Sequence, residues 1–258
     1  MHLVRIAAAT VGLGLVGLLS ACGGGGTEEL TAQTAAGLWN GTADSMQREV
    51  SAVTLSDGRY FAVYSGVGTG ATIAGGVQGT ATVADGTLNS SDLLSFSVDT
   101  SGTPPAGTAT TGTFTAQVVP RFALAGTATV PNQPPVKFQA NYESEFERTP
   151  TLAGLAGSYT GDAGFASGVR PGSTFTISAT GGVTSTINGC SITGTVVPRT
   201  DGNAYDLSLL FGGSPCALPN LRFDGIVFLR HDGQQLYSVS RNTQFRQTIV
   251  FSGLKQAS

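Results

Sequence analysis

Short apolar runs separated by turn residues follow one another along most of the chain after residue 37. Within many runs apolar and polar side chains alternate, which is typical of a strand with one buried face. Asp57-Gly58, Asp201-Gly202 and Asp232-Gly233 each separate two such runs, and Asp-Gly in this setting favours a tight hairpin. The pattern predicts sixteen strands, at 38–44, 50–56, 59–65, 76–84, 92–98, 111–118, 121–129, 135–142, 157–162, 173–179, 182–188, 190–198, 203–212, 221–230, 234–241 and 245–252.

The strands form two sets of eight whose sequences resemble each other. Residues 37–41 (GLWNG) match 157–161 (GSYTG) as glycine, aromatic and glycine at alternate positions. Further matches follow in the same order, among them 53–56 (VTLS) with 175–178 (FTIS). Between the sets, Thr149-Pro150 interrupts any strand, because proline cannot donate to a strand ladder. The sequence therefore predicts a duplication with a boundary near Pro150 and two halves that fold independently.

Eight antiparallel strands joined by short turns close into an up-and-down barrel, which leaves no free edge. We therefore predict an all-β fold with two tandem, eight-stranded, lipocalin- or streptavidin-like barrels. Side chains fill the interior of a barrel this size, or it holds one small ligand. A membrane-spanning barrel is the alternative, but its strands run to about ten residues with apolar side chains facing lipid. Most strands here are shorter, and one face is often polar, as at Thr113, Thr115 and Gln117.

The N-terminus has the layout of an export signal. Arg5 precedes an apolar stretch at 6–19, which at about fourteen residues is too short for a membrane-spanning helix of about twenty. Such a stretch is typical of a secretory signal peptide. Small residues then lead to Cys22, and the run Gly23–Gly26 that follows has no side chains to pack, so it predicts a flexible tether.

The four residues Leu19-Ser20-Ala21-Cys22 resemble a bacterial lipobox. The resemblance implies that Cys22 carries a diacylglycerol and becomes the first residue of the mature protein. An ordinary cleaved signal with an incidental cysteine is the alternative. Gly23 stands where an aspartate would imply retention at the inner membrane, so the resemblance implies a Gram-negative outer-membrane lipoprotein. The predicted division is 1–21 signal peptide, 22–36 lipidated cysteine and tether, 37–148 first barrel and 149–258 second barrel.

Paired small barrels behind a lipobox and a glycine tether resemble bacterial surface lipoproteins of the transferrin-binding protein B and factor H-binding protein type. The resemblance rests on Cys22, on Gly23–Gly26 and on the predicted strand count. It implies a two-barrel architecture, and no receptor-binding motif carries over residue by residue.

Charge argues against nucleic acid as a partner. Without Arg5, twelve basic residues face sixteen acidic ones, a formal charge of −4, and only two lysines occur, Lys137 and Lys255. A nucleic-acid-binding surface needs a basic patch. Only 11% of the residues are charged, well below the ~25% of an average domain.

Two cysteines remain once Cys22 is assigned to the lipid. An exported chain meets an oxidising compartment, where Cys190 and Cys216 are expected to form a disulfide. Pairing about the Asp201-Gly202 turn places residue 190 opposite residue 213, three positions from Cys216. The two cysteines lack the further Cys or His ligands of a zinc site.

The sequence offers few candidate catalytic residues. The mature chain has a single histidine, His231, which lies beside the Asp232-Gly233 turn and is expected to be solvated. Glu143, Glu145 and Glu147 alternate with other residues, which predicts three carboxylates on one solvated face of a strand. We predict no cofactor and no metal site, because Ca²⁺ needs six or more converging oxygens.

The predicted strand order places four arginines at one rim of the second barrel. Strand ends and loops at this rim carry the arginines of a candidate site for an anionic ligand or an acidic partner: Arg170, Arg222, Arg241 and Arg246. Cys190 and Cys216 fall at the same rim, and the alternative is that the arginines only solvate strand ends. We therefore predict a non-enzymatic, lipid-anchored envelope protein that binds a macromolecule or a small ligand through barrel loops. A structural accessory of the outer membrane without a discrete ligand is the first alternative, and an enzyme is the second.

Overall fold

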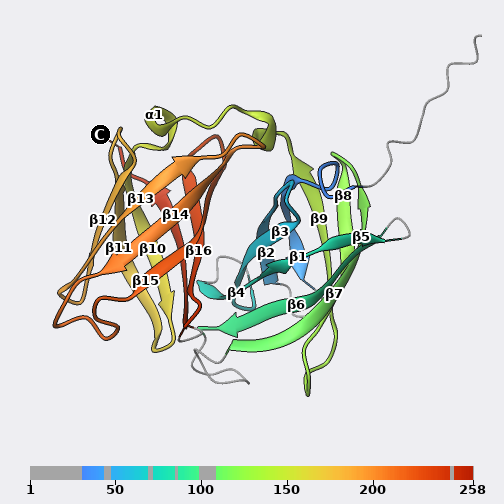
Figure 1. The fold of residues 1–258 in the computed structure, drawn as a ribbon, viewed down its shortest axis with the longest axis horizontal. Coiled ribbons are helices and arrows are strands. Elements are labelled where there is room, and N and C mark those ends of the chain that lie inside the picture. Colours follow the sequence, from blue (N-terminus) through green and yellow to red (C-terminus); the bar gives the residue numbers. More distant parts are fainter. Residues whose placement is uncertain are drawn as a thin grey trace, which may run out of the picture.

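The computed structural model describes residues 31–43, 48–68, 72–84, 87–98, 109–244 and 247–257. Cys22, the tether Gly23–Gly26 and Arg246 lie outside the described residues. The described chain is almost entirely β, and its strands form two antiparallel barrels side by side (Figure 1). The all-β tandem-barrel prediction is therefore confirmed.

The first barrel closes with one interruption. Its sheet order is β4-β3-β2-β1-β9-β8-β7-β6-β5, and β4 also pairs with β6, so the ring is complete. Ala81 separates β4 from the short β5, and both pair with β6, so they occupy a single place in the ring. The strands are β1 (Gly37–Ala43), β2 (Arg48–Thr54), β3 (Arg59–Ser65), β4 (Ile73–Thr80), β5 (Thr82–Ala84), β6 (Thr87–Ser97), β7 (Ala109–Val119), β8 (Ala123–Thr129) and β9 (Val136–Glu143).

The second barrel is an uninterrupted meander in which each strand pairs with the next and β17 returns to β10. Its strands are β10 (Gly157–Phe165), β11 (Gly168–Ile177), β12 (Gly182–Ile187), β13 (Cys190–Pro198), β14 (Ala204–Phe211), β15 (Arg222–Arg230), β16 (Gln235–Asn242) and β17 (Gln247–Lys255). Every predicted strand overlaps an observed one, because alternation and turn residues mark strands locally.

The sequence matches between the halves fall at corresponding places. Gly37 begins β1 and Gly157 begins β10, the first strands of their barrels. The turns after the second strands are also alike. Gly58 and Gly181 both have φ +84°, a left-handed conformation that favours glycine, and each carbonyl accepts a hydrogen bond from the fourth-strand region of its barrel. The two barrels therefore share local geometry as well as strand order.

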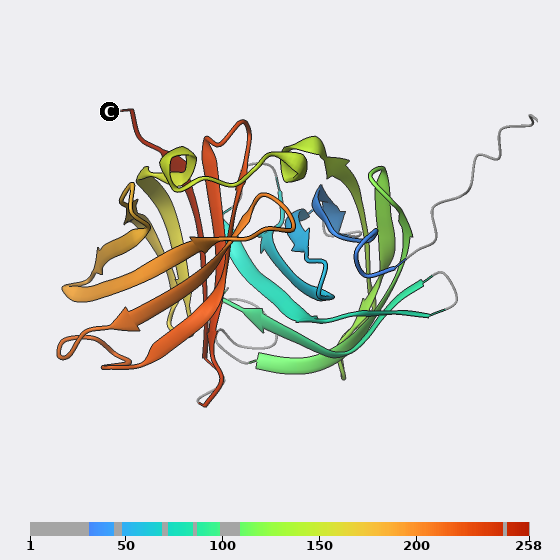
Figure 2. The same cartoon turned by 45° about the horizontal axis from the view of Figure 1, so that its top comes forward.

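The interiors of both barrels are filled by side chains. Trp39, Tyr60 and Phe114 lie in the core of the first barrel, and Tyr159 and Phe223 lie in that of the second. The linker between the barrels contains a 3₁₀ helix (Ser144–Glu147) and a short helix α1 (Leu152–Leu155). Leu155 of α1 is fully buried in the second core, so α1 covers one end of that barrel (Figure 2).

A third apolar cluster joins the barrels, and we call it the seam. It consists of outward-facing residues of the first barrel (Leu38, Val53, Phe61, Val63, Ile73, Phe96) and of the second (Ile226, Phe228, Tyr237, Val239, Val250), with Leu55, Val98, Phe146 and Ala204. Here β4 contacts β10 and β17, and β3 contacts β16. A barrel produced alone would expose this face to water. Independent folding of the halves, with the boundary near Pro150, stays a prediction.

The acidic stretch near the boundary does not continue as a strand. Glu143 ends β9, whereas Glu145 and Glu147 lie in the 3₁₀ helix, so the prediction of three carboxylates on one strand face was wrong. Phe146 explains the turn of the chain, because its ring packs into the seam over Gly202. A Cβ on Gly202 would lie 2.2 Å from this ring. The need to bury Phe146 therefore overrides the alternating pattern.

Candidate functional site

The disulfide between Cys190 and Cys216 is present, with Cα atoms 4.5 Å apart. The register of β13 and β14 pairs Ile192 with Phe211, which continues to the predicted pairing of positions 190 and 213. The loop at 212–221 then brings Cys216 to Cys190. It is held against the start of β13, because the amide of Gly212 donates to the carbonyl of Ser191 at 2.8 Å. The disulfide thus fixes the loop between β14 and β15 to the start of β13.

Arg170, Arg222 and Arg241 share one end of the second barrel, but the side chains of Arg222 and Arg241 do not face its interior. In β15, Phe223 faces the core, so its neighbours Arg222 and Asp224 face outward. The Nε of Arg222 lies 3.0 Å from Oδ1 of Asp224, and Arg241 stands opposite Asp224 on β16. Both arginines therefore lie on the outer wall and not around a central opening.

Arg170 is engaged locally. Its guanidinium donates to the carbonyls of Ser167 and Val169 and to the Ser167 hydroxyl, at 3.1 to 3.4 Å. Arg241 differs, because its Nε is buried and no described residue accepts a hydrogen bond from it. The structure brings Arg222 and Arg241 to the same strand pair, holds Arg170 in its own hairpin, and does not describe Arg246.

The sequence did not reveal a charged cluster between the barrels. Arg199 is largely buried and contacts three carboxylates: Nε lies 2.8 Å from Oδ1 of Asp201, Nη1 lies 3.0 Å from Oδ1 of Asp206, and Nη2 lies 3.2 Å from Oδ2 of Asp57. Asp57 belongs to the first barrel and the others to the second. The amide and hydroxyl of Ser56 also donate to Asp201 across the boundary.

Pairing with arginine lowers the pKa of two carboxylates in this cluster, those of Asp201 and Asp57. Burial raises the pKa of Asp201, but hydrogen bonds from Arg199 and Ser56 outweigh it and lower the pKa to about 2. Burial likewise opposes ionisation of Asp57, and Arg59 and Arg199 lower its pKa despite that. Both side chains are therefore charged at neutral pH, and the cluster holds the β2–β3 turn against the β13–β14 turn.

Arg230 forms a second polar contact within the seam. Its side chain is 6% exposed, Nη1 donates to the Ser51 hydroxyl at 2.7 Å, and Nη2 lies 3.4 Å from Oε1 of Glu143. The guanidinium also lies over the ring of Tyr237, 5.9 Å from its centre. A buried cation is costly unless it is paired. Because Ser51 and Glu143 belong to the first barrel and Arg230 to the second, the barrels must dock in an orientation that keeps these groups together.

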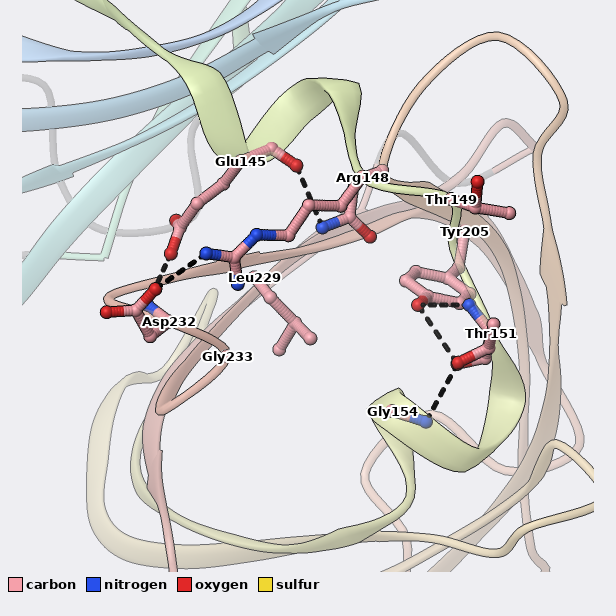
Figure 3. A pocket seen from close by; sticks show the side chains of 10 residues that line it. Glu145, Arg148, Thr149, Thr151, Gly154, Tyr205, Leu229, Asp232 and Gly233 are labelled. Carbon is pink, nitrogen blue, oxygen red and sulfur yellow. Dashed lines mark hydrogen bonds and ion pairs between the residues drawn. The ribbon is translucent and has the colours of Figure 1, made fainter.

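A small cavity of about 170 Å³ lies where the linker meets the second barrel (Figure 3). Its polar groups largely satisfy one another. The Tyr205 hydroxyl accepts from the amide of Thr151 and donates to its carbonyl, both at 3.1 Å, and Arg148 Nη2 lies 2.7 Å from Asp232 Oδ1. Leu229 supplies an apolar wall. The described residues that line the cavity include no histidine, cysteine, serine or lysine.

His231 lies exposed in the turn between β15 and β16, with φ +55°. This position confirms the expectation of a solvated turn histidine. In the described part of the chain, no three His, Cys, Asp or Glu side chains are grouped so that they could hold a metal ion. That part of the chain also contains no helix that is long and apolar enough to span a membrane.

No protein-family model and no curated protein sequence matches the chain. Solved structures similar to it include transferrin binding protein B from Neisseria meningitidis serogroup B, at 11% identity and a TM-score of 0.31. A variant of transferrin binding protein B from Haemophilus parasuis matches at 8% identity and the same TM-score. Each match covers 82% of this chain, which spans 66% of the length of either protein.

A further match is the Myxococcus xanthus hemagglutinin, solved in complex with a mannopentaose, at 13% identity and a TM-score of 0.17. It covers 85% of this chain and 88% of the hemagglutinin. The transferrin-binding protein B resemblance expected from the sequence is thus found by structure comparison, and it concerns architecture alone.

Proposed function

We propose that the protein is a non-enzymatic outer-membrane lipoprotein, anchored at Cys22, that binds a macromolecular partner through loops at its barrel ends. The observation that carries this proposal is the pair of closed barrels with filled interiors. Aromatic side chains occupy the space in which a lipocalin-like barrel would hold a small ligand. Binding through outer surfaces and loops is what this architecture leaves available.

The disulfide-bearing end of the second barrel is the face that we assign to the partner. It carries the loop at 212–221, which the disulfide and the backbone bonds of Gly212 and Asn220 hold in place. A loop held in one conformation loses less entropy on binding. Arg222 and Arg241 lie at this end beside Asp224, and we propose that acidic groups of the partner compete with Asp224 for these two arginines.

The anchor is tested by fatty-acid labelling in cells. Cys22→Ser should abolish incorporation of an alkyne fatty acid and release the protein from membranes. Cys190→Ser combined with Cys216→Ser serves as the control and should keep the label. Unchanged membrane retention of the Cys22 variant would contradict the proposed anchor.

Partner binding is tested by site-specific photo-crosslinking on intact cells. A photoreactive residue replaces Arg222 at the disulfide-bearing end or, as a control, the exposed Thr184 on the barrel wall. We expect a defined adduct from position 222 and none from position 184. Equal adduct patterns from the two positions, or none from either, would contradict a binding role for this end.

A further inference from the structure

The hairpin between β7 and β8 presents apolar side chains to water. Phe122 is 71% exposed and Val119 is 55% exposed, and they stand on either side of Pro120 and Arg121. Single exposed apolar residues are common on protein surfaces, whereas Val119 and Phe122 are exposed together at one loop tip. We call residues 119–122 the hairpin tip.

The hairpin tip is held rigidly although its ring is exposed. The Phe122 amide donates to the carbonyl of Val119, and the Phe122 carbonyl accepts from the amide of Tyr142, both at 3.0 Å. Arg121 adopts φ +55°, and its Nε lies 3.3 Å from Oε1 of Glu147 on the linker. These contacts fix the backbone, so the ring is presented outward in a defined position.

The described chain begins at the same end of the first barrel. Residues 31–36 form a turn in which the Ala35 amide donates to the carbonyl of Thr31, and Ala35 is buried in the barrel core. The Thr54 hydroxyl donates to the Ala35 carbonyl at 2.5 Å. From this turn the chain enters β1, and in both views the turn lies next to the green strands that include the hairpin tip (Figures 1 and 2).

Only residues 23–30 separate Cys22 from this turn. Fully extended, such a segment spans at most about 30 Å, and as a flexible coil it spans on average about 16 Å. A lipid on Cys22 would therefore hold this end of the barrel, and not the opposite end, close to the bilayer surface. The tether also raises the local concentration of the hairpin tip at that surface, so that a weak contact becomes populated.

We infer that the hairpin tip is a second membrane contact, in which Phe122 and Val119 enter the interfacial region of the bilayer to which Cys22 is anchored. The inference rests on the proposed lipid anchor. Aromatic side chains favour the membrane interface, and one or two apolar residues bind it only weakly without an anchor. Arg121 is already paired with Glu147, so the contact is apolar and is expected to be insensitive to salt. The disulfide-bearing end of the second barrel then faces away from the membrane.

The test uses the mature chain 22–258, with its Cys22 thiol coupled to a maleimide phospholipid in phosphatidylcholine vesicles. Phe122→Trp places a reporter at the hairpin tip, and Val67→Trp places one at the opposite end of the same barrel, where Val67 is 61% exposed. Trp39 is the single natural tryptophan and is fully buried, so it gives the same background in both variants.

On coupling, emission from position 122 should shift to shorter wavelength and be quenched by brominated phospholipid, whereas emission from position 67 should not change. Equal behaviour of the two reporters would overturn the inference. A shift at position 122 that depends on protein concentration without vesicles would also overturn it, in favour of contact with a second copy. Chemical coupling replaces the cellular lipid, so failure here is separate from failure of Cys22 labelling in cells.

Discussion

Replacement of Phe228 by alanine tests whether the seam couples the two barrels. Phe228 belongs to the second barrel but faces the first, is fully buried, and stacks on Tyr237 with ring centres 5.4 Å apart. Truncation of a fully buried phenylalanine costs about 3–5 kcal/mol, from lost transfer free energy and from the cavity left behind. The whole of this cost applies only if the seam stays closed in the folded protein.

The assay is urea unfolding followed by Trp39 fluorescence. Trp39 reports on the first barrel alone, while the change is made in the second. With a slope of about 3 kcal/mol/M for a chain of this size, the midpoint of the Trp39 transition should fall by roughly 1–1.7 M. Far-UV circular dichroism, which reports on both barrels, should give the same midpoint.

The control is Leu210→Ala, on the outer wall of the second barrel, where the side chain is 49% exposed. A change at such a position typically alters stability by no more than about 0.5 kcal/mol. If Phe228→Ala leaves the Trp39 midpoint where it is in the unmodified protein, the reasoning is refuted, because the seam would not couple the barrels. The halves would then be independent folding units, as the sequence analysis predicted.

Two further predictions concern covalent and electrostatic stabilisation. The disulfide joins two cysteines with a sequence separation of 26 residues, and its removal by Cys190→Ser and Cys216→Ser should lower the free energy of unfolding by about 3.5 kcal/mol in the entropic model. Urea unfolding measures this loss, and an unchanged free energy of unfolding would contradict that model here. Because the pKa of Asp201 is lowered to about 2 in the folded protein, its contribution to stability should be full above pH 4 and lost as the pH falls towards 2. Thermal unfolding should therefore show that the difference in stability between Asp201→Asn and the unmodified protein becomes smaller as the pH is lowered from about 4 to about 2. A difference that stays constant over this range would count against the assigned pairing.

Local sequence patterns determined the strands, the turns and the disulfide. Each hairpin depends on residues close together in the chain, so Asp201-Gly202 sufficed to set the register that brings Cys190 near Cys216. Local patterns failed at Glu145 and Glu147, where burial of the intervening Phe146 decided the conformation. The same patterns placed Arg222 and Arg241 at one end of the second barrel but did not predict that they lie on its outer wall.

Only the tertiary structure decided how the barrels meet. In β15, Phe223 and Val227 face the core while Ile226 and Phe228 face the other barrel, and this burial on both faces explains its long apolar run. The sequence contains the run but not the identity of the surface that covers it. Arg199 contacts Asp57, which lies 142 positions away, and such a contact leaves no local trace in the sequence. Alternation reports which side of a strand is apolar, whereas the partner of an outer face depends on how two closed barrels dock.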